Sequence, residues 1–176
     1  MLDSRILEAA HFASIKHKGQ SRKDFEKTPY INHPLSLANI LAVESGIEDS
    51  EVICGALLHD TIEDTDTSEE ELLDHFGVNI TRIVLEVTDD KTLKKDERKE
   101  AQVAHAPHIS EQAKLVKLAD KISNLRDIAN SPPYGWNTRR KQEYFDWAAR
   151  VVEGIRGTHE KLEFLFDQAY AFRPKD

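Results

Sequence analysis

The stretch KLVKLADKISNLRD, residues 114–127, decides the fold. Apolar residues in it and just after it recur every three or four positions, at Leu115, Leu118, Ile122, Leu125 and Ala129. This period matches one face of an α-helix, so we predict a long amphipathic helix from Ser110 to Ala129. Asp120 falls at the edge of the apolar stripe. A carboxylate there needs a partner, either a lysine (Lys117 or Lys121) or a bound metal.

The segments on both sides of this helix have the same helical period. Further helices are expected from Ser4 toward Gly19, from Pro34 to before Gly46, from Glu51 to about Asp60, from Thr67 to Gly77, up to Pro107, from Asn137 onward, and from Thr158 onward. The candidate N-caps are Asp3 or Ser4, Asp49 or Ser50, Thr67, Asn137 or Thr138, and Thr158. Residues 80–87 also fit a helix, although their β-branched side chains leave a strand as an alternative. The sequence therefore predicts an all-α, single-domain bundle of about eight or nine helices over residues 1–176.

Composition limits the class of protein. A length of 176 residues, with 39% hydrophobic and 32% charged side chains, is typical of one ordinary globular domain. The net charge of −8 disfavours DNA or RNA as a partner. No apolar run approaches the ~18 residues needed to span a bilayer, and the N-terminus lacks the features of a signal peptide. The single cysteine, Cys54, lies in an apolar run and is expected to be buried and unpaired. We therefore expect a cytoplasmic protein without membrane or nucleic-acid partners, while the sequence does not indicate its oligomeric state.

Basic side chains nevertheless gather locally. They occur in small groups along the chain, at Arg22, Lys23, Lys91, Lys94, Lys95, Arg98, Arg139 and Arg140. Each group is either a solvated surface or a contact for a small phosphate-bearing ligand. The sequence thus leaves a small anionic ligand open.

Potential metal ligands lie at or near helix ends. They are His33, expected at or beside the N-cap of the helix that Pro34 starts, the pair His59 and Asp60, and Asp120. In the run HDTIED, two further acids follow Asp60 by three and four residues, at Glu63 and Asp64. One helical turn would gather these carboxylates, and their mutual repulsion is tolerable if a cation or a shared proton neutralises it. Taken one at a time, the histidines and aspartates could instead be helix caps, and the acids of HDTIED could form a solvated turn.

Taken together, these residues resemble a known family. The set His33, His59, Asp60 and Asp120 resembles the H…HD…D signature of the HD superfamily, a helical fold that holds a divalent metal. The motifs RKD, TPYINHP, LLHDTIEDT, FG, VTDDKT and KLVKLADKISNLRD resemble the hydrolase domain of RelA/SpoT proteins and of stand-alone small alarmone hydrolases. The likeness extends from about Ala9 to Trp147. One departure is the spacer DFEKT before Pro29, which is longer than in many full-length RelA/SpoT enzymes.

The resemblance implies roles for individual residues. It implies that His33, His59, Asp60 and Asp120 bind one divalent metal, usually Mn²⁺ in this family, and that Glu63 and Asp64 act on the reacting phosphate. It also implies substrate contacts from Arg22 to the guanine, with Lys23 nearby, from Asn124 to the ribose, and from Lys95, Arg140 and Tyr144 to phosphates. Imidazole and carboxylate ligands suit Mn²⁺, Fe²⁺ or Zn²⁺ and leave positions open for water and substrate.

The activity that the resemblance implies is removal of the 3′-pyrophosphate from a guanosine alarmone such as guanosine 3′,5′-bis(diphosphate), ppGpp, giving GDP and pyrophosphate. Two alternatives use the same site. One is removal of the 2′-phosphate of NADPH, which also presents a phosphate on a ribose next to a purine. The other is a non-catalytic module that binds nucleotide, which loss of a metal ligand or of Glu63 and Asp64 would have favoured. The sequence retains all of these residues.

Overall fold

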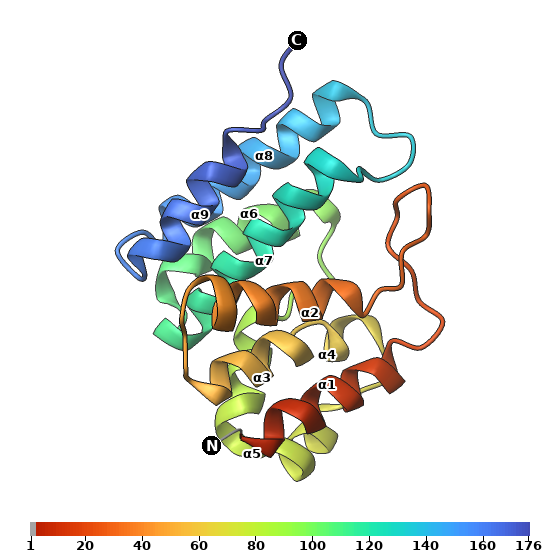
Figure 1. Cartoon of the computed structure of the whole chain (residues 1–176), viewed down its shortest axis with the longest axis vertical. Helices are drawn as coiled ribbons and strands as arrows, with labels where there is room; N and C mark the ends of the chain where they lie inside the picture. The colour runs from red at the N-terminus through yellow and green to blue at the C-terminus, as the bar shows by residue number, and fades with distance from the viewer. Residues whose placement is uncertain (1–2) are drawn as a thin grey trace.

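A computed structural model describes residues 3–176, and this part of the chain forms helices joined by turns (Figure 1). The elements, including a π-helical turn (η1) and a 3₁₀ turn (η2), are α1 (Ser4–Lys16), α2 (Asn32–Asn39), η1 (Ile40–Glu44), α3 (Ser50–Leu58), α4 (Thr61–Asp64), α5 (Glu69–Val87), α6 (Lys95–His105), η2 (Ala106–His108), α7 (Glu111–Asn130), α8 (Thr138–Glu153) and α9 (Glu160–Tyr170). Among the described residues the only β-type pairing is two isolated bridges. The predicted all-α fold is confirmed.

The long helix predicted from the opening motif is α7, which begins one residue after Ser110 and ends one residue after Ala129. The strand alternative for residues 80–87 is wrong, because these residues form the second half of α5. The helical backbone is interrupted at Gly77, as the sequence predicts, and a second helical segment follows directly, so that α5 contains two helices joined at a kink. Gly77 has φ 77°, a conformation that glycine adopts at little cost, and it kinks α5 at that point.

Side-chain caps fix several helix starts. Asp3, Asp49 and Asn137, each one of two adjacent candidates in the sequence, accept backbone N–H groups of the helices that follow them. Two predicted caps are wrong by one residue, because Ser68 caps α5 in place of Thr67, and His159 caps α9 in place of Thr158. A cap must have an extended backbone and an acceptor that reaches back to the first turn, and adjacent polar residues compete for that position.

The start of α2 differs from the prediction in a way that bears on function. The helix begins at Asn32, two residues before Pro34, and Ile31 is its N-cap. Pro34 still lies within the first turn, where a missing N–H removes no helical hydrogen bond. His33 is therefore inside the first turn, and its side chain is buried.

Two groups of buried apolar residues build the core, and α3 contributes to both. One group joins α3 to α1 and α5 in the lower half of Figure 1, and the other joins α3 and α2 to α7, α8 and α9. All residues of α3 from Val52 to Leu58 are buried, including Cys54, whose predicted burial is confirmed. At Gly55 a β-carbon would lie 2.6 Å from Cγ2 of Ile83, so only glycine permits this approach of α3 and α5.

An irregular segment between α1 and α2 reaches across to the loop between α7 and α8, on the right of Figure 1. The two meet through a bridge between Asp24 and Pro133, and the backbone N–H of Tyr134 donates to the carbonyl of Lys23 at 2.7 Å. Together the two segments, residues 17–31 and 131–137, form an arch beside α7. Within residues 3–176, every helix is too short or too polar to cross a membrane.

Candidate metal centre and adjoining cleft

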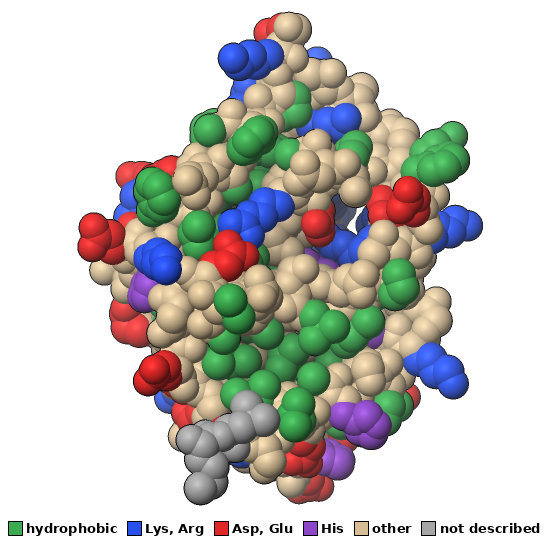
Figure 2. Space-filling view, viewed as in Figure 1, with side chains coloured by type: hydrophobic (Ala, Val, Ile, Leu, Met, Phe, Trp, Pro, Cys, Tyr) green, Lys and Arg blue, Asp and Glu red, His purple; other side chains and the backbone are tan. Residues whose placement is uncertain are grey.

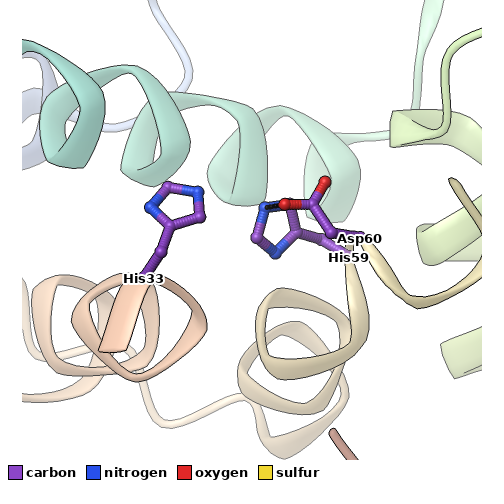
Figure 3. A group of neighbouring side chains, drawn as sticks. All are labelled: His33, His59 and Asp60. Atoms are coloured by element: carbon purple, nitrogen blue, oxygen red, sulfur yellow. Dashed lines mark ion pairs between the residues drawn. The ribbon is translucent and has the colours of Figure 1, made fainter. Parts of the chain in front are cut away.

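Four predicted metal ligands from three regions of the chain meet beside α7. Nitrogen or oxygen atoms of His33, His59 and Asp60 lie within 4.8 Å of one another (Figure 3). Asp120 completes the group, because its Oδ1 lies 3.1 Å from Nε2 of His33 and 3.7 Å from Nε2 of His59. The first turn of α2, the end of α3 and the middle of α7 therefore each supply part of one site.

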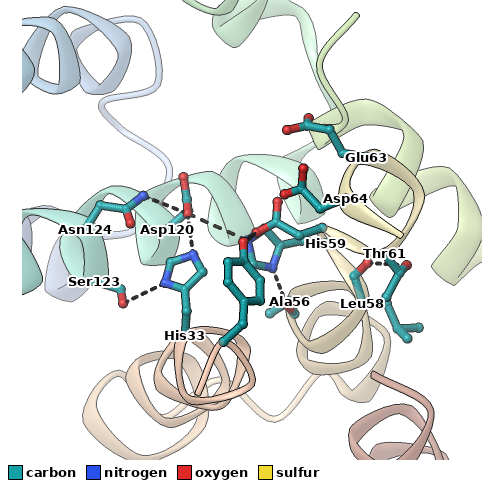
Figure 4. Close-up of polar contacts among 12 residues, drawn as sticks. His33, Ala56, Leu58, His59, Thr61, Glu63, Asp64, Asp120, Ser123 and Asn124 are labelled. Carbon is teal, nitrogen blue, oxygen red and sulfur yellow. Dashed lines mark hydrogen bonds and ion pairs between the residues drawn. The ribbon is translucent and has the colours of Figure 1, made fainter. Parts of the chain in front are cut away.

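The backbone and α7 orient both imidazole rings (Figure 4). Nδ1 of His59 lies 2.7 Å from the carbonyl oxygen of Ala56, so Nδ1 carries the proton that this bond requires. Nδ1 of His33 pairs with the hydroxyl of Ser123 at 3.2 Å. In both rings Nε2 faces the carboxylates, which is how metal-binding histidines are usually held.

The donor set fits a divalent cation. Among the described residues, Nε2 of His59 is buried and has no hydrogen-bond partner, although Oδ2 of Asp60 is only 3.0 Å away. A histidine nitrogen that faces carboxylates without a hydrogen bond can share a cation with them as a common ligand. Burial alone would lower the pKa of His59, but the carboxylates of Asp60 and Asp120 raise it to about 9. These carboxylates therefore require a positive charge between them, from a proton or a metal.

Neighbouring side chains hold the two acidic ligands in place. The hydroxyl of Tyr30 donates to Oδ2 of Asp60. Nζ of Lys121 lies 3.1 Å from Oδ2 of Asp120, and Nδ2 of Asn124 donates to Oδ1 at 3.0 Å. Burial opposes the ionisation of Asp120, but Lys121 and the histidines hold its pKa well below the ordinary value. Burial likewise opposes the ionisation of Asp60, but His59 and His33 lower its pKa, so both aspartates are ionised and available as ligands at neutral pH.

The other two predicted acids lie on α4, next to the four predicted metal ligands. Carboxylate oxygens of Asp60, Glu63 and Asp64 lie within 4.8 Å of one another. Burial is the main cause that raises the pKa of Glu63 to about 7; the backbone N–H of Asp89, which donates to Glu63 at 2.6 Å, opposes this rise, and the neighbouring acids add to it. Asp64 is more exposed and pairs with Lys91 at 2.8 Å. Glu63 is thus able to exchange a proton near neutral pH.

Two adjacent cavities lie beside the candidate metal centre and share wall residues, including Tyr30 and His33. The smaller, of about 360 Å³, contains His59, Asp60, Glu63 and Asp120 in its wall. The larger, of about 860 Å³, lies under the arch and extends along the C-terminal half of α7. Figure 2 shows a hollow to the right of centre, with basic side chains visible inside it. The combined space has room for a nucleotide with one phosphate group at the metal.

The predicted substrate contacts lie around both cavities, with one exception. Residues in the walls of both are Arg22, Lys23, Asn124 and Tyr144, and Lys95 borders the smaller one. Arg22 donates to Asn124 and pairs with Asp127, each at 3.0 Å. Arg140 borders neither cavity and packs over the ring of Trp136, itself in the wall of the larger one, at 4.4 Å.

Sequence reasoning did not assign a role to several residues of this site. Tyr30 contacts Asp60, Asp127 contacts Arg22, and Asp89 contacts Glu63. Tyr30 could have been found from the sequence, because it precedes His33 by three residues in the motif TPYINHP. Lys117 was considered only as a partner for Asp120, and the structure gives that position to Lys121.

Comparison with known proteins agrees with this geometry. Residues 9–148 match the HD domain family, a span that includes all four converging residues. The chain belongs to the HD domain family. The chain is 60% identical over 165 residues to guanosine-3′,5′-bis(diphosphate) 3′-pyrophosphohydrolase MESH1 of Xenopus tropicalis. This match covers 94% of this chain and 92% of the relative. The MESH1 of Homo sapiens is 59% identical over 160 residues, covering 91% and 89%.

Two solved structures resemble this chain. The structure described as a metazoan ortholog of SpoT that hydrolyzes ppGpp and plays a role in starvation responses superposes with a TM-score of 0.94. It is 44% identical, and the match covers 98% of this chain and 97% of that one. The protein lmo0812 of Listeria monocytogenes, at 24% identity and a TM-score of 0.65, covers 83% of this chain and 97% of that one, and shares the fold.

Proposed function

We propose that this protein hydrolyses the 3′-pyrophosphate of ppGpp and releases GDP and pyrophosphate. The observation that carries this proposal is that a likeness to MESH1 hydrolases over nearly the whole chain coincides with four converging metal ligands. Retention of Glu63 and Asp64 beside these ligands favours an enzyme over a module that only binds nucleotide.

The proposed metal site consists of His33, His59, Asp60 and Asp120. Two imidazoles and two carboxylates suit a first-row divalent ion, and we propose Mn²⁺. When bound, such an ion supplies a Lewis acid for the phosphoryl group and lowers the pKa of water. The roles of Tyr30, Lys121 and Asn124 are to fix the acidic ligands through the contacts described above.

Glu63 is the proposed general base. Its carboxyl is anchored on one side by the N–H of Asp89, and its raised pKa is close to the pH at which it must accept a proton from the attacking water. Asp64, which is more exposed and paired with Lys91, is proposed to orient the water or the phosphate. Attack on the 3′-linked phosphorus breaks its bond to the ribose oxygen, so the two phosphates leave together.

The nucleoside is proposed to occupy the larger cavity. Arg22 would stack on the guanine beside Lys23, and Asn124 would face the ribose. Their position in the walls of both cavities supports this orientation, because it places the ribose at the junction and its 3′ substituent at the metal. Lys95, Tyr144 and Arg140 are proposed phosphate contacts, and for Arg140 this requires its side chain to leave the ring of Trp136.

A single assay tests the proposal. Purified protein loaded with Mn²⁺ is incubated with ppGpp, pppGpp, NADPH and GMP, and the products are separated by chromatography. We expect GDP and intact pyrophosphate from ppGpp and no turnover of GMP. Asp120→Ala serves as the control for contaminating phosphatases. Orthophosphate from NADPH without cleavage of ppGpp would contradict the proposal and identify a 2′-phosphatase.

A further inference from the structure

A lysine that the proposed reaction leaves without a role borders the smaller cavity. Lys117 lies on α7, one turn before Asp120, and its side chain is only 7% exposed. The cavity wall around it also contains Glu63, Asp89 and Lys121. Lysine is among the residues least often buried, and a buried ammonium group normally has a carboxylate partner.

Lys117 has no such partner within residues 3–176. Neither an ion pair nor a hydrogen bond joins its Nζ to another residue, whereas the adjacent Lys121 is held by Asp120 at 3.1 Å. Burial, and then the charge of Lys121, lower the pKa of Lys117 to about 8, so most of the group is still charged at neutral pH. An unpaired cation that faces a cavity is suited to an anionic ligand.

The order of residues along α7 indicates which part of a ligand would reach Lys117. Asp127 and Asn124 border the larger cavity, Asp120 is at the metal centre, and Lys117 borders only the smaller cavity. With a rise of 1.5 Å per residue, Lys117 is about 4.5 Å beyond Asp120, on the side away from Asn124. A nucleoside under the arch, with its 3′-linked phosphorus at the metal, would direct its next phosphate toward this lysine.

We propose that Lys117 binds the terminal phosphate of the 3′-diphosphate and so makes the site selective for a pyrophosphate over a single phosphate. This inference rests on the proposed function and identifies the residue that recognises the second phosphate. Lys117 forms and breaks no covalent bond in the reaction. The ammonium group contributes a charge-assisted hydrogen bond to a group that leaves with the product.

The test compares two ligands in one assay. The ligands are ppGpp, as substrate, and guanosine 5′-diphosphate 3′-monophosphate, as a competitor of ppGpp turnover. We expect Lys117→Met to lower kcat/KM for ppGpp by about 10- to 100-fold, the usual effect of losing a hydrogen bond to a charged group. The inhibition constant of the 3′-monophosphate should change by less than about threefold, because this ligand has no terminal phosphate to lose. Equal losses on both ligands, or no loss on either, would overturn the proposal.

Two controls separate recognition from folding. Lys114→Met removes a lysine one turn earlier on α7, where it pairs with Glu111 at 3.0 Å and borders neither cavity, and should leave both constants unchanged. Lys117→Met should bind as much Mn²⁺ as the parent and have an equal or higher Tm, because it removes an unpaired buried charge. A lower Tm together with equal losses on both ligands would show that Lys117 only supports the fold.

A failure of the proposed function can be distinguished from a failure of the Lys117 assignment. If the proposed function is wrong, the unmodified protein does not cleave ppGpp, and this is measured before any variant. Calorimetric titration of the Mn²⁺-loaded parent and Lys117→Met proteins with ppGpp and with the 3′-monophosphate then tests the lysine by binding alone. A preference of the parent for ppGpp that disappears in Lys117→Met supports the assignment, and the same preference in both proteins contradicts it.

Discussion

The ionisation of Glu63 should set the acidic side of the pH profile. Its carboxyl lies next to Asp60 and Asp64 and accepts the N–H of Asp89. Burial, followed by these neighbouring charges, raises its pKa to about 7, compared with an ordinary value of 4.5. A general base must be deprotonated to act, so activity is present above this pKa and is lost as the pH falls through it.

The size of the expected loss of activity follows from the titration of a single group, the Glu63 carboxyl. With a pKa of about 7, the ionised fraction of Glu63 is about one half at pH 7, about one tenth at pH 6 and about one hundredth at pH 5. A bound divalent cation lowers the pKa of a neighbouring carboxyl, so in the Mn²⁺-loaded protein we expect kcat/KM for ppGpp to fall about tenfold per pH unit below an apparent pKa that lies between 4.5 and about 7. The measurement is steady-state kinetics from pH 5 to pH 9 in buffers of constant ionic strength, with bound Mn²⁺ determined at each pH.

Glu63→Gln is the matched variant, because glutamine keeps the shape and cannot accept the proton. We expect its kcat to be lower by about 10² to 10⁴ and its residual rate to lose the acidic limb that Glu63 causes. A limb with an apparent pKa near 4.5 in the parent would refute the argument from burial. A Glu63→Gln protein with the parental rate and profile would remove Glu63 from the reaction.

Three further variants test other parts of the structure. His59→Ala should abolish Mn²⁺ uptake and turnover together, since it removes one of four converging ligands, and metal analysis beside a rate assay checks this. Arg22→Ala should mainly raise KM, by the equivalent of about 1–3 kcal/mol for a lost stacking contact, with a small change in kcat. Gly55→Ala should lower the free energy of unfolding by about 1–3 kcal/mol, measured in urea, because its β-carbon would meet Ile83 at 2.6 Å.

Helix positions were predictable wherever one physical requirement dominated. The apolar residues from Leu115 to Ala129 can all be buried on one face only if this segment is an α-helix. The observed α7 agrees with the predicted helix within one residue at each end. The candidate metal ligands could be proposed only as a set, because each histidine or aspartate by itself could equally be a helix cap or a solvated group. The helix follows from local sequence, whereas the candidate site depended on the resemblance of the whole set to the HD signature.

The contacts between distant segments could not be read from the sequence in the same way. Tyr30 meets Asp60, and Arg22 meets Asp127, across 30 and 105 residues. No local pattern specifies such pairs, because the packing of α2, α3 and α7 brings them together. The errors at Thr67 and Thr158 have a different origin, since adjacent polar residues are almost equally good caps and small differences in backbone geometry choose between them.

The distribution of charge explains how an acidic protein is suited to a substrate with four phosphates. The net charge of −8 would repel such an anion if it were spread evenly. Seven basic side chains border the smaller cavity, namely Arg22, Lys23, Lys95, Arg98, Lys99, Lys117 and Lys121, beside five acidic ones. Two of those acids are proposed metal ligands, and a divalent ion would neutralise them. The cavity would then carry a net positive charge, which favours entry of a polyphosphate although the chain as a whole is acidic.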